Sequence, residues 1–541
     1  MDQFQVYDTT LRDGAQQEGM NLSVADKLEI AALIDRLGVG FIEGGWPGAI
    51  PKDTEFFARA AKELQLANAV LTAFGATRKA GLTASQDPQV KALLDAETPV
   101  ITLVAKSDSR HVAKALKTSG EENLAMIRDT VAYLAAEGRR VFVDLEHFFD
   151  GYRFDPEYAV ACVGAATEAG AEVVVLCDTN GGMLPSWIDQ IVSATAGAWP
   201  SAKLGVHCHN DTGCAVANTM AAVAAGATHV QGTINGYGER TGNADLTSII
   251  PNLVLKLGIP ALSLDKLAEL TGTAHAIAEI TNIAPQARQP YVGHSAFAHK
   301  AGLHASAIRV DPDMYQHTDP LAVGNDMRML VSEMAGRASI ELKGRELGFD
   351  LAGNAAVLSA VTEKVKLLEA QGYTFDAADA SFELLLRDAM DVLPVYFQVE
   401  SWRAISEAQG AASFAHTAQS AGPYPGPAGA SEATVKLHAG DRRFVATGEG
   451  NGPVNALDAA LRLALIEVYP ELATIELVDY KVRILDTTRG TDAITRVLIE
   501  MTTGAQLWRT VGVGANIIEA SWQALTEALV FGLIHLGVPV R

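Results

Sequence analysis

From residue 4 to about residue 235, short apolar runs rich in β-branched residues alternate with longer runs of helical periodicity. In the run Ser23–Leu37, Ser23 is a candidate N-cap, and Gly38 follows the last helical residue. Strands that alternate with helices indicate a parallel sheet, and eight such units in about 250 residues predict a closed (β/α)8 barrel. The strand-like runs are Phe4–Asp8, Val39–Glu43, Ala69–Phe74, Val100–Val104, Val141–Glu146, Glu172–Cys177, Lys203–Cys208 and His229–Ile234.

An open doubly wound sheet is the alternative arrangement of the same elements. That fold requires a glycine-rich phosphate-binding loop after the first strand, and the segment Asp8–Gly14 is not such a loop. We therefore assign residues 1–265 to the barrel. The next segment, 266–393, is mostly helical, ends in the amphipathic run Ala377–Met390, and is interpreted as a helical linker region.

The pattern changes at about residue 394, where three strand-like runs and one helical run occur twice in succession. This repetition predicts an α+β domain of duplicated βββα units at 394–541, with a flexible insertion at 409–431 that is rich in Ala, Gly, Ser and Pro. We interpret the domain as regulatory or dimerising, and a stabilising appendage without a ligand is the alternative. The runs are Val395–Ile405, Ala433–His438, Arg443–Thr447 and Val454–Val468, then Ile475–Leu485, Thr495–Thr502, Leu507–Val513 and Ile517–Ile534.

Composition narrows the class of protein and its partners. The chain has 64 acidic and 42 basic residues and a formal net charge of −22, which opposes binding to nucleic-acid phosphates. Its apolar stretches are interrupted before the ~18 residues that a membrane span needs, and the residues before the first strand lead us to expect no signal peptide. The four cysteines include no C-x-x-C pair and do not make a disulfide framework. We expect a soluble, cytoplasmic protein without nucleic-acid or membrane partners.

Polar residues follow the ends of several predicted strands, which is where barrel enzymes carry their catalytic groups. His207 and His209 are two residues apart on the seventh strand, so both side chains point to one face while Cys208 points to the other. Asp13, after the first strand, would complete a three-ligand metal site with open positions. Two imidazoles and one carboxylate suit Zn²⁺, Mn²⁺, Co²⁺ or Fe²⁺, and Mg²⁺ where waters complete the coordination.

Two further charged residues at strand ends are open to more than one interpretation. Arg12 is either part of an ion pair at the barrel rim or a fixed cation aimed at a developing oxyanion. Glu146, at the end of the fifth strand, is either an ionised rim carboxylate or a general base or hydrogen-bond partner. The glycines around Gly236 do not form a dinucleotide-binding loop, because the third glycine is missing and the loop follows the eighth strand.

Three long motifs, Asp8–Gln17, Gly205–Gly213 and Asn235–Ala244, resemble the signatures of the 2-isopropylmalate synthase, homocitrate synthase and citramalate synthase family. The resemblance covers essentially the whole chain, including the duplicated C-terminal domain. Within the family, Glu43–Gly48 and Glu146–Tyr152 look most like the (R)-citramalate branch. The resemblance implies an acyltransferase that condenses acetyl-CoA with pyruvate and water to give (R)-citramalate and CoA, the entry to isoleucine biosynthesis.

The resemblance also implies roles for individual residues. As metal ligands it implies Asp13, His207 and His209, with Asn243 as a fourth or outer ligand of an Mn, Mg, Zn or Co ion. The catalytic residues that it implies in the barrel are Arg12, which would stabilise the enolate or alkoxide oxygen, and Glu146, which would take part in proton abstraction. The substrate would be bound by Arg12, Glu43 and Thr179, and Thr179 would hydrogen-bond the oxo-acid carboxylate.

Beyond the barrel, the resemblance implies a catalytic histidine and a tyrosine that approaches the site. His304 is the candidate histidine, with His294 and His299 as alternatives, and Tyr315 is the candidate tyrosine. The resemblance further implies a homodimer and feedback inhibition by isoleucine or leucine bound to the C-terminal domain. The alternatives are a 2-isopropylmalate synthase acting on 2-oxoisovalerate, a carbon–carbon lyase with the same barrel, and a non-catalytic amino-acid sensor. The duplicated domain argues against the lyase, and the intact metal triad argues against the sensor.

Overall fold

The computed structural model describes residues 4–308, 310–331, 336–351, 353–406, 431–485 and 493–541. They form two compact units, Met1–Phe297 with His317–Met327, and Ala298–Gln316 with Arg328–Arg541. Except for Ser431, the insertion predicted at 409–431 lies outside the described residues. The first unit contains the barrel, and the second contains linker helices and the C-terminal strands.

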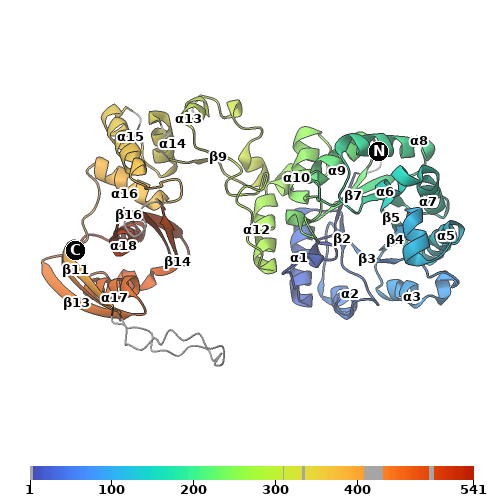
Figure 1. Cartoon of the computed structure of the whole chain (residues 1–541), viewed down its shortest axis with the longest axis horizontal. Helices are drawn as coiled ribbons and strands as arrows, with labels where there is room; N and C mark the ends of the chain where they lie inside the picture. Colours follow the sequence, from blue (N-terminus) through green and yellow to red (C-terminus); the bar gives the residue numbers. More distant parts are fainter. Residues whose placement is uncertain (1–3, 309, 332–335, 352, 407–430, 486–492) are drawn as a thin grey trace. The chain divides into compact units, whose positions relative to one another are not determined.

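The first unit is built on a closed parallel barrel, seen among its surrounding helices in Figure 1. Strand β1 pairs with β2 on one side and with β8 on the other, so the sheet closes and the open doubly wound alternative is excluded. All eight predicted strand runs overlap the observed strands, which confirms the (β/α)8 barrel. The strands are β1 Gln5–Asp8, β2 Phe41–Glu43, β3 Val70–Ala76, β4 Val100–Lys106, β5 Arg140–Glu146, β6 Val173–Asp178, β7 Leu204–Cys208 and β8 His229–Gly232.

Helix α1 (Val24–Leu37) shows how local sequence sets the ends of a barrel helix. The Ser23 side chain accepts a hydrogen bond from the Asp26 amide, and the Asp26 carboxylate accepts one from the Ser23 amide. The helix ends at Gly38, whose φ of 95° is left-handed and favours glycine. The other helices of this unit are α2 Pro51–Glu63, α3 Pro88–Asp95, α4 Ser109–His111, α5 Gly120–Ala136, α6 Phe148–Phe154, α7 Pro156–Glu168, α8 Pro185–Ala198, α9 Ala215–Ala224, α10 Leu246–Pro251, α11 Leu264–Leu267 and α12 Leu270–Thr281.

The inside of the barrel changes from apolar to charged along the strands. One buried cluster joins apolar side chains of β1, β2, β4, β5 and β6, which only the barrel interior can bring together. On β5 this cluster includes Phe142, and the same face continues with Asp144 and then Glu146 at the carboxyl end. The same alternation on β7 directs Cys208 into the outer core, while His207 takes the inward side. Charged groups therefore collect at the carboxyl ends of the strands, as the sequence predicted.

The second unit begins with short elements and linker helices. The strands β9 (Ala298–His299) and β10 (Arg328–Met329) form a small parallel pair. Helix α16 (Asp379–Ala389) occupies most of the run predicted as amphipathic, and its buried face packs in a cluster with α14 and α15. The remaining linker helices are α13 Gly302–Ile308, α14 Arg337–Glu346 and α15 Ala355–Ala370.

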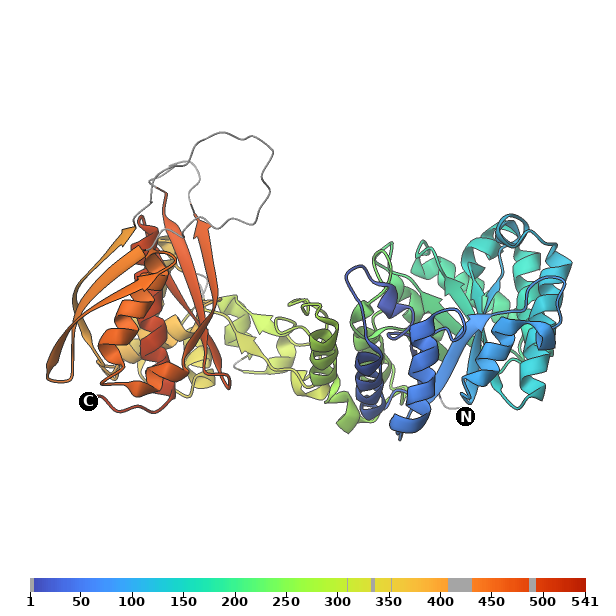
Figure 2. The same ribbon diagram turned by 90° about the horizontal axis from the view of Figure 1, so that it is seen from below.

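The C-terminal part consists of two βββα units, which confirms the predicted duplication. Each unit is a three-stranded antiparallel sheet in sequence order, followed by a helix that packs on it (Figure 2, orange to red). Residues of both sheets and both helices share one core. The elements are β11 Gln398–Ser406, β12 Ser431–Ala439, β13 Arg442–Gly450 and α17 Pro453–Leu465, then β14 Glu476–Ile484, β15 Thr495–Thr502, β16 Leu507–Gly514 and α18 Ile517–His535.

Helix α18 is the one described helix that is long and apolar enough, by length and composition, to span a membrane. The sequence analysis did not anticipate a stretch of this length. In the structure, 56% of its apolar window is buried, and the helix packs against β15 and β16. Its apolar composition is accounted for by these core contacts.

Equivalent glycines let each helix approach the third strand of its sheet. Gly448 on β13 and Gly512 on β16 both lie five residues before their helix begins. A Cβ atom on Gly448 would lie 2.4 Å from the Ala460 amide nitrogen, and one on Gly512 would lie 1.9 Å from the Ala520 carbonyl oxygen. Both contacts are with helix backbone, which cannot move aside without displacing the helix. The shared glycine position explains part of the sequence repetition.

Gly512→Ala is expected to lower the free energy of unfolding of the C-terminal part by about 1–3 kcal/mol, because the new methyl group overlaps the α18 backbone. Thermal and urea unfolding followed by circular dichroism would measure the change. Gly514→Ala is the matched control on the same strand, since its Cβ would lie 3.5 Å from the nearest heavy atom. Equal stability of the two variants would show that the close approach is not needed.

Candidate active site

A cavity of about 540 Å³ opens where the barrel strands end. Among the predicted site residues, its lining includes Arg12, Asp13, Glu146, Thr179 and His209. They come from the loops or ends that follow β1, β5, β6 and β7, which are far apart in sequence and adjacent in the closed barrel. The barrel thus brings these residues to one site at its carboxyl end, as expected for this fold.

Asp13, His207 and His209 form the predicted triad. Their donor atoms all lie within 4.8 Å of one another. The Asp13 carboxylate oxygens are 3.7 Å from Nε2 of His207 and 4.0 Å from Nε2 of His209. Two ligand atoms that each lie about 2.1 Å from one ion can be at most about 4.2 Å apart. The distances from Asp13 to the two histidines therefore fit a shared divalent ion.

Hydrogen bonds around the triad also fit a metal site. Oε1 of Gln231 is 2.8 Å from Nδ1 of His207, so Nδ1 carries the proton and Nε2 keeps its lone pair for an ion. Asn243 donates from Nδ2 to Asp13 at 3.0 Å, and its buried Oδ1 has no hydrogen-bond partner among the described residues. A buried oxygen without a hydrogen-bond partner, next to three convergent metal-ligand atoms, is explained by a bound ion or by a water on that ion. Asn243 therefore fits the position of an additional ligand or of a residue that orients Asp13.

The charge states of the triad suit cation binding. Burial alone would raise the pKa of Asp13, but the Arg12 guanidinium and the hydrogen bond from Asn243 hold the pKa below its ordinary value. Burial, together with the neighbouring His207, lowers the pKa of His209 to about 4. An ionised carboxylate and a neutral imidazole are the forms that bind a metal ion.

Arg12 is held rigidly from several sides. Its Nε donates to Glu43 at 2.5 Å, its Nη1 donates to Asp13 at 2.8 Å, and its guanidinium lies 3.8 Å from the Phe74 ring centroid. Glu43 is fully buried, and it also accepts a hydrogen bond from the Tyr7 hydroxyl at 2.6 Å. Burial alone would lower the pKa of Arg12, but the two carboxylates raise it, so the side chain remains a fixed cation in the cavity wall.

Glu146, at the end of β5, and Thr179, directly after β6, also line the cavity. Glu146 forms an ion pair with Lys106 at the end of β4. The Thr179 hydroxyl accepts a hydrogen bond of 2.8 Å from the His147 amide, which leaves its own proton for a further acceptor. Arg240 donates to the Thr179 carbonyl and pairs with Asp211, so the loop that carries Thr179 is tied to its neighbour.

The candidates beyond the barrel strands divide between the two units. His304 lies on α13 in the second unit, where its ring stacks on Tyr315 with a centroid distance of 4.0 Å. His299 is also in the second unit, 6.1 Å from His304 between ring centroids, whereas His294 belongs to the first unit. The structure thus pairs the candidate histidine with the candidate tyrosine, and their roles stay predictions.

Sequence reasoning missed two residues that contact the predicted site. Lys106 ends β4, and a charge at a strand end is a signal that the sequence contained. Gln231 carried no such signal, because it lies within β8 and reaches His207 only through the register of β7 with β8. Gln231 also donates to the buried Asp144 at 3.0 Å, so the orientation of His207 is coupled to a third strand.

Comparisons with known families cover most of the chain. The barrel at residues 3–274 matches the HMGL-like family model. Residues 291–373 match the model described as homocitrate synthase post-HMGL domain-like, and residues 376–532 match the LeuA allosteric (dimerisation) domain. The last match covers most of the duplicated βββα domain.

Comparisons with individual proteins place the chain within this family. An (R)-citramalate synthase of Streptomyces coelicolor is 62% identical over 99% of this chain and 98% of its own length. An (R)-citramalate synthase of Synechocystis is 48% identical over 98% of this chain and 96% of its own length. A 2-isopropylmalate synthase of a Geobacillus species is 30% identical over 98% of this chain and 97% of its own length. The chain belongs to the (R)-citramalate synthase family, within the wider group of HMGL-like enzymes.

Proposed function

We propose that this protein is an acyltransferase that condenses acetyl-CoA with pyruvate and water to give (R)-citramalate and CoA. The observation that carries the proposal is the triad of Asp13, His207 and His209, of which Asp13 and His209 line one cavity together with the fixed Arg12 cation. The high identity to (R)-citramalate synthases over the full chain supports pyruvate as the oxo acid. The lower identity to 2-isopropylmalate synthase makes 2-oxoisovalerate the less favoured substrate.

Asp13, His207 and His209 would hold the divalent metal that enzymes of the HMGL-like family use, with Asn243 as a further ligand or a support for Asp13. When bound, the ion supplies a Lewis acid that polarises the ketone of the 2-oxo acid. Two imidazoles with one carboxylate favour Mn, Co or Zn, and Mg where waters complete its coordination. Gln231 would keep His207 in the tautomer that offers Nε2.

The chain's own residues would bind and orient the reactants. Arg12, fixed by Glu43 and Asp13, would stabilise the negative charge that develops on the enolate or alkoxide oxygen. Glu43 would act mainly by positioning Arg12, because it is buried behind the cavity wall. The free proton of the Thr179 hydroxyl would bind the oxo-acid carboxylate.

The reaction requires several proton transfers: the methyl group of acetyl-CoA loses a proton, the alkoxide formed from the ketone gains one, and water loses one in the thioester hydrolysis. Glu146 would take part in the proton abstraction from acetyl-CoA, with Lys106 holding its carboxylate in place through their ion pair. His304 and Tyr315, which stack on each other, are proposed for the remaining acid–base steps. The assignment of Glu146 follows the family resemblance and its place in the cavity lining, and those of His304 and Tyr315 follow the family resemblance.

Purified full-length protein, supplied with Mn²⁺ or Mg²⁺ and acetyl-CoA, is expected to release free thiol with pyruvate. The value of kcat/KM with pyruvate should exceed that with 2-oxoisovalerate by at least about tenfold, because two additional methyl groups must be excluded from the site. Chiral analysis of the product would identify (R)-citramalate. Thiol release with 2-oxoisovalerate alone would instead identify a 2-isopropylmalate synthase, and no release with any oxo acid would contradict the proposal.

The remaining parts of the chain are proposed to regulate and assemble the enzyme. We assign residues 1–265 to catalysis, 266–393 to a helical linker and 394–541 to a regulatory and dimerisation domain. The match to the LeuA allosteric (dimerisation) domain supports a homodimer with feedback by isoleucine or leucine. The same comparisons favour a cytoplasmic enzyme whose small-molecule partners are acetyl-CoA and a 2-oxo acid.

A further inference from the structure

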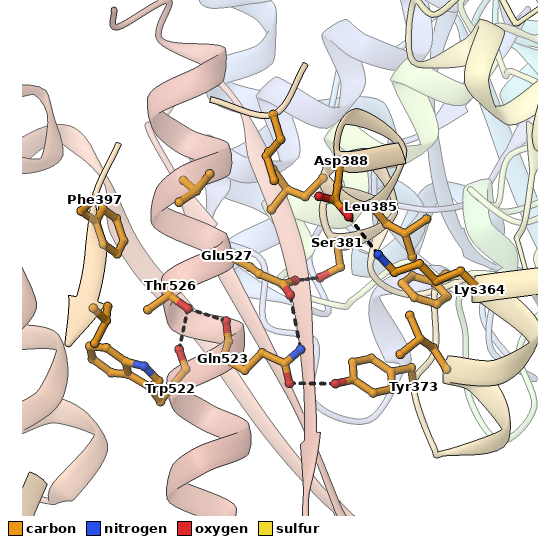
Figure 3. A pocket seen from close by; sticks show the side chains of 16 residues that line it. Lys364, Tyr373, Ser381, Leu385, Asp388, Phe397, Trp522, Gln523, Thr526 and Glu527 are labelled. Carbon is orange, nitrogen blue, oxygen red and sulfur yellow. Dashed lines mark hydrogen bonds and ion pairs between the residues drawn. The ribbon is translucent and has the colours of Figure 1, made fainter. Parts of the chain in front are cut away.

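A second cavity lies within the second unit, between linker helices and the last helix of the chain. Its volume is about 450 Å³, which is in the range of small-molecule sites. Helix α15 contributes Lys364, α16 contributes Ser381 and Asp388, and α18 contributes Trp522 and Glu527 (Figure 3). Most of the remaining lining is apolar, including several leucines of α16 and the segments beside it. None of these residues takes part in the barrel site.

Glu527 is the acidic lining residue for which no cation among the described residues serves as a counter-ion. Ser381 donates its hydroxyl proton to one carboxylate oxygen, and Gln523 donates to the other at 3.4 Å. Ser381 is itself oriented by the Val511 amide, and Gln523 by the Tyr373 hydroxyl at 2.9 Å. Among the described residues no cation contributes to its pKa, and burial raises that pKa to about 7. The carboxylate is therefore oriented by hydrogen bonds and short of positive charge.

Aromatic rings line the rest of the cavity. In Figure 3, Trp522 and Phe397 lie on one side of Glu527 and Tyr373 lies on the other, and Phe375 is a further lining residue. The negative face of an aromatic ring attracts a cation, and aromatic groups around an acid are the usual setting for organic ammonium ligands. An apolar body would also find an apolar surface here.

The other charges at this cavity are already neutralised. Lys364 and Asp388 pair with each other at 2.9 Å, and both side chains are about half exposed. Lys364 therefore does not supply the missing charge to Glu527. A metal ion is a poor occupant, because most of the lining is apolar and Asp388, the second carboxylate of the lining, already pairs with Lys364. An anion would meet the Glu527 carboxylate without a free cation among the described lining residues.

We propose that this cavity binds a small organic ammonium ion, an amine with an apolar body, whose charged head pairs with the Glu527 carboxylate among the aromatic rings. Such a ligand would contact α15, α16 and α18 together, so its binding would hold the linker helices against the C-terminal domain. The site is separate from the barrel chemistry, and its test does not depend on the condensation reaction.

The direct test compares three ligands with the same six-carbon chain, titrated calorimetrically into full-length protein. n-Hexylammonium is expected to bind, 1-hexanol is expected to bind at least about tenfold more weakly, and hexanoate is expected not to bind. Glu527→Gln keeps the size of the side chain and removes its charge, so n-hexylammonium should bind about tenfold more weakly to this variant. Leu385→Trp, which fills the cavity, should remove binding altogether.

A pH series on the unaltered protein gives a second test that needs no variant. Because burial raises the pKa of Glu527 to about 7, n-hexylammonium should bind roughly tenfold more tightly at pH 8 than at pH 6. The Glu527→Gln variant should lose this dependence. Other charged or titratable groups near Glu527 remain unchanged in this variant, so any pH dependence that they cause would persist. They are the pair Lys364–Asp388, the cluster Glu383–Arg387–His535, and Tyr373, whose pKa is raised by burial.

Three results would overturn the proposal. The first is no binding of n-hexylammonium at pH 8. The second is equal binding of n-hexylammonium and 1-hexanol, which would make the cavity a general apolar pocket. The third is a pH dependence that persists in a folded Glu527→Gln protein, which would assign the charge recognition to another group.

Discussion

Replacing Asp13 by Asn is expected to remove the bound divalent metal and to lower kcat for citramalate formation by at least about 10³-fold, since a Lewis-acid ion contributes several kcal/mol to such reactions. The amide keeps the shape of the side chain but removes the negative charge among the three donors. The Arg12 cation, 2.8 Å from the carboxylate, would then keep only Glu43 as an anionic partner, so it would repel the incoming ion more strongly. Metal content after dialysis, measured by mass spectrometry, and thiol release would record both effects.

Cys208→Ala is the matched control for this prediction. Cys208 lies on β7 between the two histidines, but it is buried in the outer core on the opposite face of the strand. Its replacement should cost a little stability and leave metal content and kcat unchanged. His209→Gln, by contrast, should behave like Asp13→Asn. If Asp13→Asn retained its metal and its activity, the triad would not be the metal site.

Arg12→Lys is expected to lower kcat by about 10²–10³-fold, although it keeps the positive charge. The guanidinium uses separate nitrogens to reach Glu43 and Asp13 while it lies on the Phe74 ring, and an ammonium group cannot reproduce that planar arrangement. The effect should appear mainly in kcat, because Arg12 is proposed to act on the charge that develops during reaction. Steady-state kinetics with pyruvate and acetyl-CoA would separate kcat from KM.

Loss of stability must be distinguished from loss of catalysis, because Arg12 neutralises the buried Glu43. Arg12→Gln should therefore also lower the free energy of unfolding, by about 3 kcal/mol, because it leaves the Glu43 charge buried without a partner. Arg12→Lys keeps the charge and should not have this effect. Arg140→Lys is the control substitution. Arg140 also donates two hydrogen bonds to a carboxylate, that of Glu172, but it lies at the start of β5 and is partly exposed. It should leave kcat unchanged. A normal kcat for Arg12→Lys would contradict the proposed role of the guanidinium.

Much of the fold could be predicted because each element carries its own local signal. The Ser23–Asp26 capping box and Gly38 define α1 without reference to any other part of the chain. The alternation of short apolar runs with helices predicted the barrel, and the repeated order of strands and helix predicted the βββα duplication. The length of α18 was not anticipated as a single apolar stretch, because its apolar faces are interrupted by Glu519 and Glu527 in sequence.

The metal triad was predictable from spacing, but the groups that orient it were not. Parity along one strand places His207 and His209 on the same face, and this rule needs no tertiary information. Gln231 reaches His207 only because β7 and β8 pair in one particular register. The close approach of Arg12 to Glu43 likewise depends on the pairing of β1 with β2, since the two residues are 31 positions apart.

The sequence by itself determined the elements, their order, the inward face of β7 and the residue types that bind a divalent ion, because these depend on local periodicity and on side-chain chemistry. Only the tertiary structure decided which strands meet and in what register, and hence that Gln231 orients His207 and that Glu43 lies buried behind Arg12. It also decided that Glu527 faces a cavity built by helices far apart in sequence, as the hydrogen bond between Ser381 of α16 and Glu527 of α18, 146 positions apart, shows. The physical reason is that register and cavities arise from packing between distant segments, and packing leaves no periodic signal in the chain.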